Sequence, residues 1–211
     1  MNSRERVLGR IRQALSDTPP VTAAARDYLP THTPDDRDAV LNLLHENLVD
    51  YRATVHRITE KELPALVAEL LDRHNARTVA VPPGLPATWL SATTAEQHHD
   101  DADTPLIPHR LDTISAVITG CTLAVAETGT IILDGGPGQG RRALTLIPDL
   151  HICVIQADDQ VVASIPQALP RLNPTRPQTW ISGPSATSDI ELNRVEGVHG
   201  PRQLNVVIVT H

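Results

Sequence analysis

The residue best placed for chemistry is Glu127, an isolated carboxylate. It is the only charged residue between Asp112 and Asp134, and it stands between an apolar, helix-like stretch and the β-branched run 129–133. A carboxylate in such surroundings has to be paired, hydrogen-bonded or shifted in pKa, because a bare buried charge is very costly. Glu127 is therefore a candidate nucleophile or general base. The alternative is that it caps the local turn by accepting backbone N–H bonds.

A glycine-rich loop with two arginines follows this carboxylate. Residues 135–140 read Gly-Gly-Pro-Gly-Gln-Gly and lead directly into Arg141 and Arg142. Such a loop can bring backbone N–H groups close to an anion, whose charge the two guanidinium groups would neutralise. It is not a phosphate-binding Walker loop, because no Gly-Lys-Ser/Thr follows, and it lacks the acidic residue of a dinucleotide fingerprint. A simple chain reversal is the alternative.

Hydroxyl residues cluster again after the predicted strand 179–182. Ser182-Gly183-Pro184-Ser185 runs into segment 187–196, which we expect to be helical. A strand, a glycine turn and a helix start together form an anion-binding arrangement, and the carboxyl ends of strands in open α/β sheets line the ligand crevice. The alternative is that Ser185 or Thr187 is a simple N-cap.

The next turn adds His199, which either reaches the same site or is only solvated. The predicted ligand-binding residues are thus Thr128, Gly129, Thr130, Arg141, Arg142, Ser182, Gly183, Ser185, Thr187, Asp189, His199 and Gly200. Residues 98–101, His-His-Asp-Asp, have the composition of a metal cluster, but adjacent side chains on an extended segment point in opposite directions. We expect an exposed polar loop there and no metal site.

Composition narrows the classes of ligand. The chain has 211 residues with no Phe, two Tyr, two Trp and a net charge of −7. Few rings are available to stack a flavin, a haem or a base, and the negative charge argues against nucleic acid, whose affinity comes mainly from Lys and Arg. The two cysteines, Cys121 and Cys153, cannot hold a four-thiolate iron–sulfur cluster. We expect no such cluster in this chain, and the cofactor stays unknown.

The elements that must position these residues alternate between strands and helices. Apolar runs predict strands at 54–58, 78–82, 106–108, 116–119, 129–133, 151–155, 179–182 and 204–209. Helical periodicity covers 36–51, 59–74, 158–172 and 187–196. This alternation predicts an α/β fold with one largely parallel, Rossmann-like layered sheet covered on both faces.

The N-terminal part differs from the rest. An amphipathic helix begins after Asn2, and the Pro-rich segment 16–35 reads as a linker or surface arm. We therefore divide the chain into an N-terminal helix and arm, 1–35, and an α/β domain, 36–211. No apolar run approaches the roughly 20 residues of a membrane span. No leader opens the chain either, so we expect a cytoplasmic protein.

In order along the chain, five blocks resemble the lactate utilization protein C family, whose members carry the LUD domain. They are Gly120 with Ala126-Glu-Thr-Gly-Thr-Ile-Ile-Leu133, Arg142-Ala-Leu, Pro148-Asp-Leu-His-Ile152, Ser182-Gly-Pro-Ser185 with Asp189-Ile-Glu191, and Gly197-Val-His-Gly-Pro201. The resemblance implies a fold like that of the sugar-phosphate isomerase and CoA-transferase superfamily. It also implies a role in oxidising L-lactate to pyruvate beside iron–sulfur partner proteins of the same operon. Ala186 departs from the basic or larger residue common at that position, so Arg141 or Arg142 would have to supply that anion contact.

Three hypotheses follow. The first is a subunit of an L-lactate-oxidising complex, without a redox cluster of its own, that binds a small carboxylate or other anionic ligand at the carboxyl edge of the sheet. The second is an autonomous CoA or acyl transferase, or a sugar-phosphate isomerase-like enzyme, that uses Glu127; Glu127-Thr128-Gly129 is similar to the nucleophile motif of CoA transferases. The third is a ligand-sensing or assembly module whose N-terminal arm docks a partner or a second copy.

Overall fold

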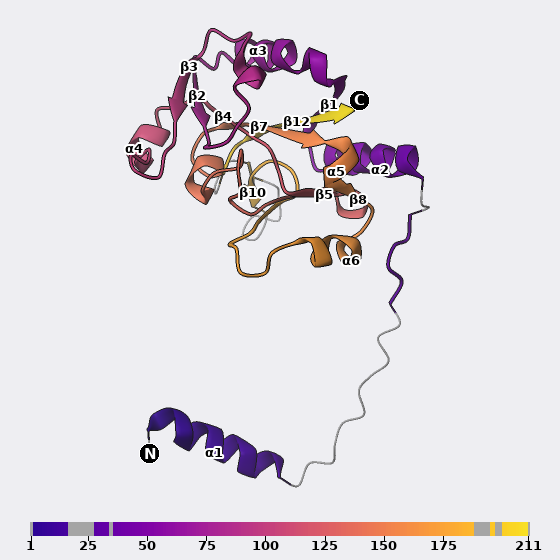
Figure 1. The fold of residues 1–211 in the computed structure, drawn as a ribbon, viewed down its shortest axis with the longest axis vertical. Helices are drawn as coiled ribbons and strands as arrows, with labels where there is room; N and C mark the ends of the chain where they lie inside the picture. Colours follow the sequence, from indigo (N-terminus) through magenta and orange to yellow (C-terminus); the bar gives the residue numbers. More distant parts are fainter. Residues whose placement is uncertain (1, 17–27, 34–35, 188–194, 197–199, 211) are drawn as a thin grey trace.

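The computed structural model describes residues 2–16, 28–33, 36–187, 195–196 and 200–210. Its centre is a sheet of six parallel strands (Figure 1). In spatial order these are β1 (Thr54–Thr59), β12 (Gln203–Thr210), β7 (Leu150–Gln156), β4 (Ala116–Thr119), β2 (Thr78–Val81) and β3 (Glu96–His99). The central strands are continuous apolar runs, which is typical of parallel strands covered on both faces. The predicted α/β class with a largely parallel sheet is confirmed.

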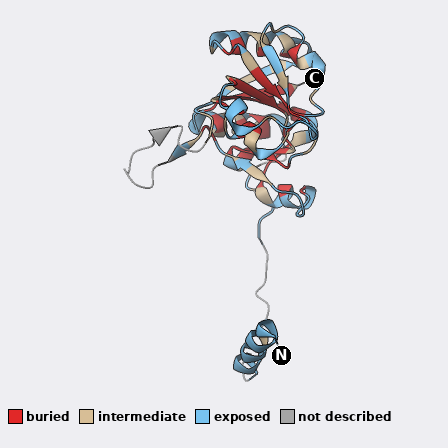
Figure 2. Ribbon diagram, turned by 90° about the vertical axis from the view of Figure 1, so that its left-hand side faces the viewer, coloured by how far each residue is buried: buried red, intermediate tan, exposed pale blue. Residues whose placement is uncertain are grey.

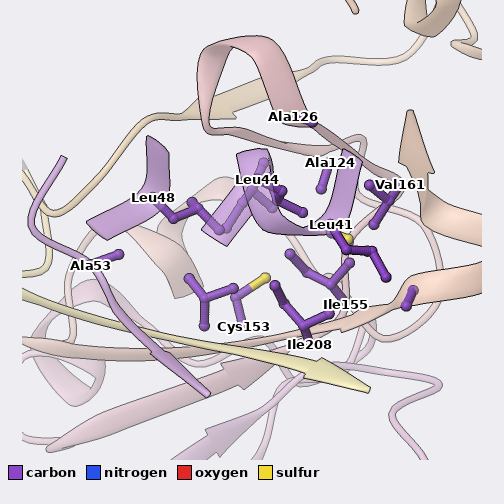
Figure 3. Close-up of a cluster of buried hydrophobic side chains, with 14 of the residues drawn as sticks. Leu41, Leu44, Leu48, Ala53, Ala124, Ala126, Cys153, Ile155, Val161 and Ile208 are labelled. Atoms are coloured by element: carbon purple, nitrogen blue, oxygen red, sulfur yellow. The ribbon is translucent and has the colours of Figure 1, made fainter. Parts of the chain in front are cut away.

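The helices α2 (Arg37–Asp50) and α3 (Leu63–Arg73) cover opposite faces of this sheet. Alternate residues of one strand point to opposite faces, and β7 shows this directly: Cys153 packs in the cluster of α2, whereas Ile152 packs in the cluster of α3. Figure 3 shows Leu44 and Leu48 of α2 lying over Cys153. Both helices therefore bury their apolar stripe against the sheet, as their periodicity predicts.

A second sheet, which the sequence analysis did not predict, lies on the α2 side of the core. Its four strands, in order, are β8 (Val161–Val162), β5 (Leu123–Val125), β6 (Thr130–Leu133) and β9 (Thr179–Ile181). The pairs β5–β6 and β6–β9 are antiparallel. The expectation of one sheet, and of a helix-like stretch before Glu127, is therefore wrong, because a short buried apolar run has the same pattern in either structure.

Two expected helices and one expected strand are also wrong. The segment 158–172 is divided into α5 (Ala157–Gln160), the strand β8, α6 (Ile165–Ala168) and a 3-10 turn (Leu169–Arg171). Pro166 and Pro170 stand in the first turns of the last two pieces, where proline is tolerated, but neither could lie inside one continuous helix. The segment predicted as a helix over 187–196 has strands at its two ends, β10 (Ala186–Thr187) and β11 (Val195–Glu196), which pair antiparallel; residues 188–194 lie outside the described residues. Pro108 begins the helix α4 (Pro108–Leu111) where a strand was expected.

The N-terminal helix α1 (Ser3–Leu15) stands apart from the α/β body (Figure 2). It begins with the expected capping box, in which the Asn2 side chain accepts from the Glu5 amide and the Glu5 side chain accepts from the Asn2 amide. None of its residues is buried. The division of the chain at residue 35 stays a prediction. Among the described residues, the helices are too short or too polar to cross a membrane.

Candidate functional site

Five of the predicted ligand-binding residues line one cavity of about 300 Å³: Arg142, Ser182, Gly183, Ser185 and Gly200. We call it the Arg142 cavity. It lies between β9 and the amino ends of β7 and β12, which contribute His151 and Leu204. The expected position at the carboxyl edge of the parallel sheet is therefore wrong for this segment. The reason is that β9 belongs to the second sheet. The carboxyl end of β9 therefore lies near the amino ends of β7 and β12, and not near the carboxyl ends of the parallel strands.

Arg142 is the only charged side chain among the described residues that line this cavity. It is exposed, begins the 3-10 turn Arg142–Thr145, and its Nη1 donates to Oγ1 of Thr179 over 3.1 Å. One hydrogen bond leaves most of the five N–H donors of a guanidinium available. The cavity thus combines one cation with serine and threonine hydroxyls, which suits a small anion.

Two further predicted residues, Thr128 and Thr130, support the cavity wall through hydrogen bonds that lead to Ser182. Oγ1 of Thr130 lies 2.9 Å from Oγ of Ser182, and Oγ1 of Thr128 donates to Oγ1 of Thr130 over 2.8 Å. This chain of hydroxyls connects β6 to the segment that follows β9. Thr128 and Thr130 therefore orient Ser182, and neither is among the residues that line the cavity.

The glycine at 183 is required by close packing. Gly183 has φ +84°, and a Cβ atom there would lie 2.2 Å from the carbonyl oxygen of Tyr51. Beyond it, the Ser185 amide donates to the Pro201 carbonyl over 2.8 Å. The loop is thus held between the end of α2 and the segment before β12.

His151 also lines the cavity, although it is not among the residues predicted from the sequence. It is 1% exposed, and its Nε2 lies 2.8 Å from Oγ1 of Thr119. Burial lowers the pKa of its imidazole to about 4, so the ring is neutral at physiological pH. The available signal was a histidine inside the apolar run of β7, in the fourth residue of the Pro148-Asp-Leu-His block.

Glu127 lies elsewhere, where it holds the segment before α2. Its Oε1 accepts from the hydroxyls of Thr31 and Thr33, at 2.9 and 3.0 Å, and from the amides of His32 and Thr33, at 2.6 and 3.0 Å. Burial raises the pKa of this carboxyl, but these hydrogen bonds outweigh it and the pKa lies below its usual value. Glu127 thus accepts backbone N–H bonds, as the capping alternative supposed, but from residues 31–33 and not from its own turn. A covalent role for Glu127 stays a prediction.

The remaining predicted residues do not join the Arg142 cavity. Arg141 turns to a separate cavity and binds Asp100. Gly129 stands at the turn into β6, and Thr187 ends β10 rather than beginning a helix. Asp189 and His199 lie outside the described residues. Among the described residues, no three His, Cys, Asp or Glu side chains are grouped so that they could hold a metal ion.

Comparison with known proteins shows the family to which this chain belongs. The sequence profile of the LUD domain family matches residues 41–209, which include the strands of the six-stranded and four-stranded sheets, apart from the last residue of β12, and the Arg142 cavity. The chain belongs to the LUD domain family. The resemblance carried by the five sequence blocks is thereby confirmed.

Individual relatives extend the match over most of the chain. A protein from Deinococcus radiodurans named lactate utilization protein C is 46% identical over 184 residues, covering 85% of this chain and 84% of its own. A protein of the same name from Exiguobacterium is 28% identical over 234 residues, covering 99% and 96%. The crystal structure of a DUF162 family protein from Deinococcus radiodurans matches with a TM-score of 0.71 at 40% identity, over 84% of this chain and all of the other.

Proposed function

We propose that this LUD domain protein is a subunit of an L-lactate utilization system and binds a small carboxylate in the Arg142 cavity. Oxidation of L-lactate to pyruvate releases two electrons and two protons, and iron–sulfur partner proteins of the same operon would take up the electrons. The names of the two relatives support the pathway. We place this system in the cytoplasm, as the sequence leads us to expect.

The observation that carries the binding role is the convergence of Arg142 with the Ser182 and Ser185 segment in one cavity. A guanidinium presents parallel N–H donors that match the two oxygens of a carboxylate. The neutral His151 adds a hydrogen-bonding group without a second charge. Together these groups offer a carboxylate partner and polar partners for a hydroxyl or carbonyl oxygen, the two features of L-lactate and pyruvate.

The test uses the full chain together with its partner proteins. L-lactate-dependent reduction of a dye is measured with and without this chain, and then with Arg142→Gln. Loss of a charge-assisted hydrogen bond of about 1.5–3 kcal/mol should weaken L-lactate affinity about 10- to 100-fold. Arg73→Gln is the matched control, because Arg73 is an exposed arginine on α3 that pairs only with Glu69 among the described ion pairs.

Binding is measured separately by calorimetry with the isolated chain and L-lactate or pyruvate. The site is supported if Arg142→Gln binds the carboxylate more weakly than wild type does and Arg73→Gln binds it as wild type does. Dye reduction that is identical with and without the chain would rule out the subunit role. Equal binding by wild type and Arg142→Gln would move the carboxylate site elsewhere.

A further inference from the structure

A second and larger cavity, of about 760 Å³, lies at the carboxyl ends of β2 and β3. We call it the Arg176 cavity. Pro83 and Gly84 follow β2, Asp100 follows β3, and the glycine-rich loop 135–140 supplies the other side. This is the edge where open α/β sheets bind ligands. The volume lies in the range of cavities that hold organic molecules of drug or cofactor size.

The glycine-rich loop is docked on this edge of the sheet. The Gly138 amide donates to the Pro83 carbonyl over 2.7 Å, and the Gly120 amide, after β4, donates to the Gly138 carbonyl over 2.8 Å. A Cβ atom at Gly84 would lie 2.9 Å from Cβ of Pro137. The wall of the cavity is therefore preformed, and the chain reversal is not simply a solvated hairpin tip.

Two guanidinium groups are fixed at this cavity by buried carboxylates. Arg141 donates to both oxygens of Asp100 at 2.9 Å and also to the Leu106 carbonyl. Arg176 donates through Nη1 to Asp134 over 3.0 Å. The carboxylates are 5% and 8% exposed, whereas the arginine side chains are 39% and 50% exposed. The buried acids thus orient the arginines, which keep N–H groups open to the cavity side.

The rest of the lining is partly apolar and partly polar. Pro83, Pro105, Pro137 and Pro177 form rigid apolar walls. The loop amides of residues 135 and 140 make no hydrogen bond within the described part of the chain, which adds two backbone donors. The exposed carboxylate of Asp101 adds an acceptor at the rim. A fitting ligand therefore has an anionic oxygen group, an apolar ring and a hydroxyl donor.

We propose that the Arg176 cavity binds a nucleotide, with its phosphate on Arg141, Arg176 and the glycine-rich loop, its hydroxyls toward Asp101 and its base against the proline walls. The lining carries two arginines and three aspartates, Asp100, Asp101 and Asp134, so its net charge of −1 does not favour an anion. Selection comes instead from directional N–H donors, which phosphate oxygens match. The described lining contains no aromatic side chain on which a base could stack. The proline rings would instead pack against the base by apolar contact.

The test is calorimetric titration of the full chain with adenosine 5′-monophosphate, adenosine, inorganic phosphate and glucose 6-phosphate. We expect the monophosphate to bind most tightly, because only it contacts both the donors and the proline walls. The double variant Asp134→Asn/Arg176→Gln removes one guanidinium without leaving a buried unpaired charge. It should weaken the monophosphate at least about tenfold.

A second variant keeps the test independent of the ion pairs. Ala102 is exposed and lines the cavity, so Ala102→Trp should fill the cavity and abolish binding while the fold is retained. Arg142→Gln should leave nucleotide affinity unchanged. No binding of the monophosphate at millimolar concentration, or equal binding to wild type and both cavity variants, would overturn the proposal. Tighter binding of glucose 6-phosphate than of the monophosphate would overturn the nucleotide assignment.

Discussion

The imidazole of His151 lies 2.8 Å from the hydroxyl of Thr119, and both side chains are buried in the α/β body. The two residues belong to neighbouring parallel strands, β7 and β4, and lie diagonally across the pair. Thr119 thus supplies the partner that the buried ring needs, since an unpaired polar group there would be costly. This pair places a neutral histidine in the lining of the cavity in which Arg142 is the one cationic side chain among the described residues.

The first prediction concerns stability at acid pH. The pKa of His151 is lowered from 6.5 to about 4, so the unfolded chain binds this proton more readily than the folded chain. Stability is therefore full above pH 6.5 and falls as the pH drops toward 4, by up to about 3 kcal/mol from this residue. Urea unfolding of wild type and His151→Gln at pH 7.5 and pH 5 measures this. The variant should lose less stability between the two pH values; an equal loss would mean that the buried ring is not the source.

The second prediction separates the two roles of Glu127. Because its Oε1 accepts four hydrogen bonds from residues 31–33, Glu127→Ala should lower the free energy of unfolding by about 1–3 kcal/mol. The carboxyl pKa is lowered, so this contribution is present above pH 4.5 and is lost as the pH falls through the lowered value. Glu127→Gln keeps one acceptor oxygen and should lose less.

Lactate-dependent dye reduction with Glu127→Gln then tests the covalent role. We expect activity close to wild type, as for the control Glu46→Gln on the exposed side of α2. Loss of all turnover in a folded Glu127→Gln, together with a thioester mass on wild type after incubation with an acyl-CoA, would instead support the acyl-transfer hypothesis.

The third prediction concerns the loop at Gly183. Alanine at this position would combine a left-handed backbone with a Cβ atom 2.2 Å from the Tyr51 carbonyl. We expect Gly183→Ala to destabilise the protein by at least about 2 kcal/mol and to weaken carboxylate binding, because the loop must move. Gly9→Ala is the contrasting change, since a Cβ atom there meets nothing within 4 Å. Chemical denaturation that gives the same midpoint for both variants would contradict this packing.

The fourth prediction concerns the N-terminal arm. No residue of α1 is buried, so deletion of residues 1–16 should change the free energy of unfolding by less than about 0.5 kcal/mol. Deletion of residues 1–33 also removes the donors to Glu127 and should cost about as much as Glu127→Ala. If α1 docks a partner, the shorter deletion abolishes association measured by light scattering and keeps the melting temperature. A large drop in melting temperature for the shorter deletion would show that α1 packs on the body.

The sequence by itself determined the helices α1, α2 and α3 and most strands of the parallel sheet. Apolar periodicity identifies α2, α3 and strands such as β7 and β12, because burial on one stripe or on both faces leaves a local pattern. Asn2 with Glu5 specifies a capping box in the same local way. The five sequence blocks that resemble the LUD domain family were also sufficient to place the chain in that family.

Only the tertiary structure decided which residues meet. Arg141 and Arg142 are neighbours in sequence, yet Arg141 lines the Arg176 cavity and Arg142 lines the other. Glu127 finds its donors more than ninety residues earlier. The position of β9 in a second sheet moves Ser182 away from the expected edge. Such contacts depend on the pairing and register of distant strands, which no local pattern of hydrophobic residues encodes.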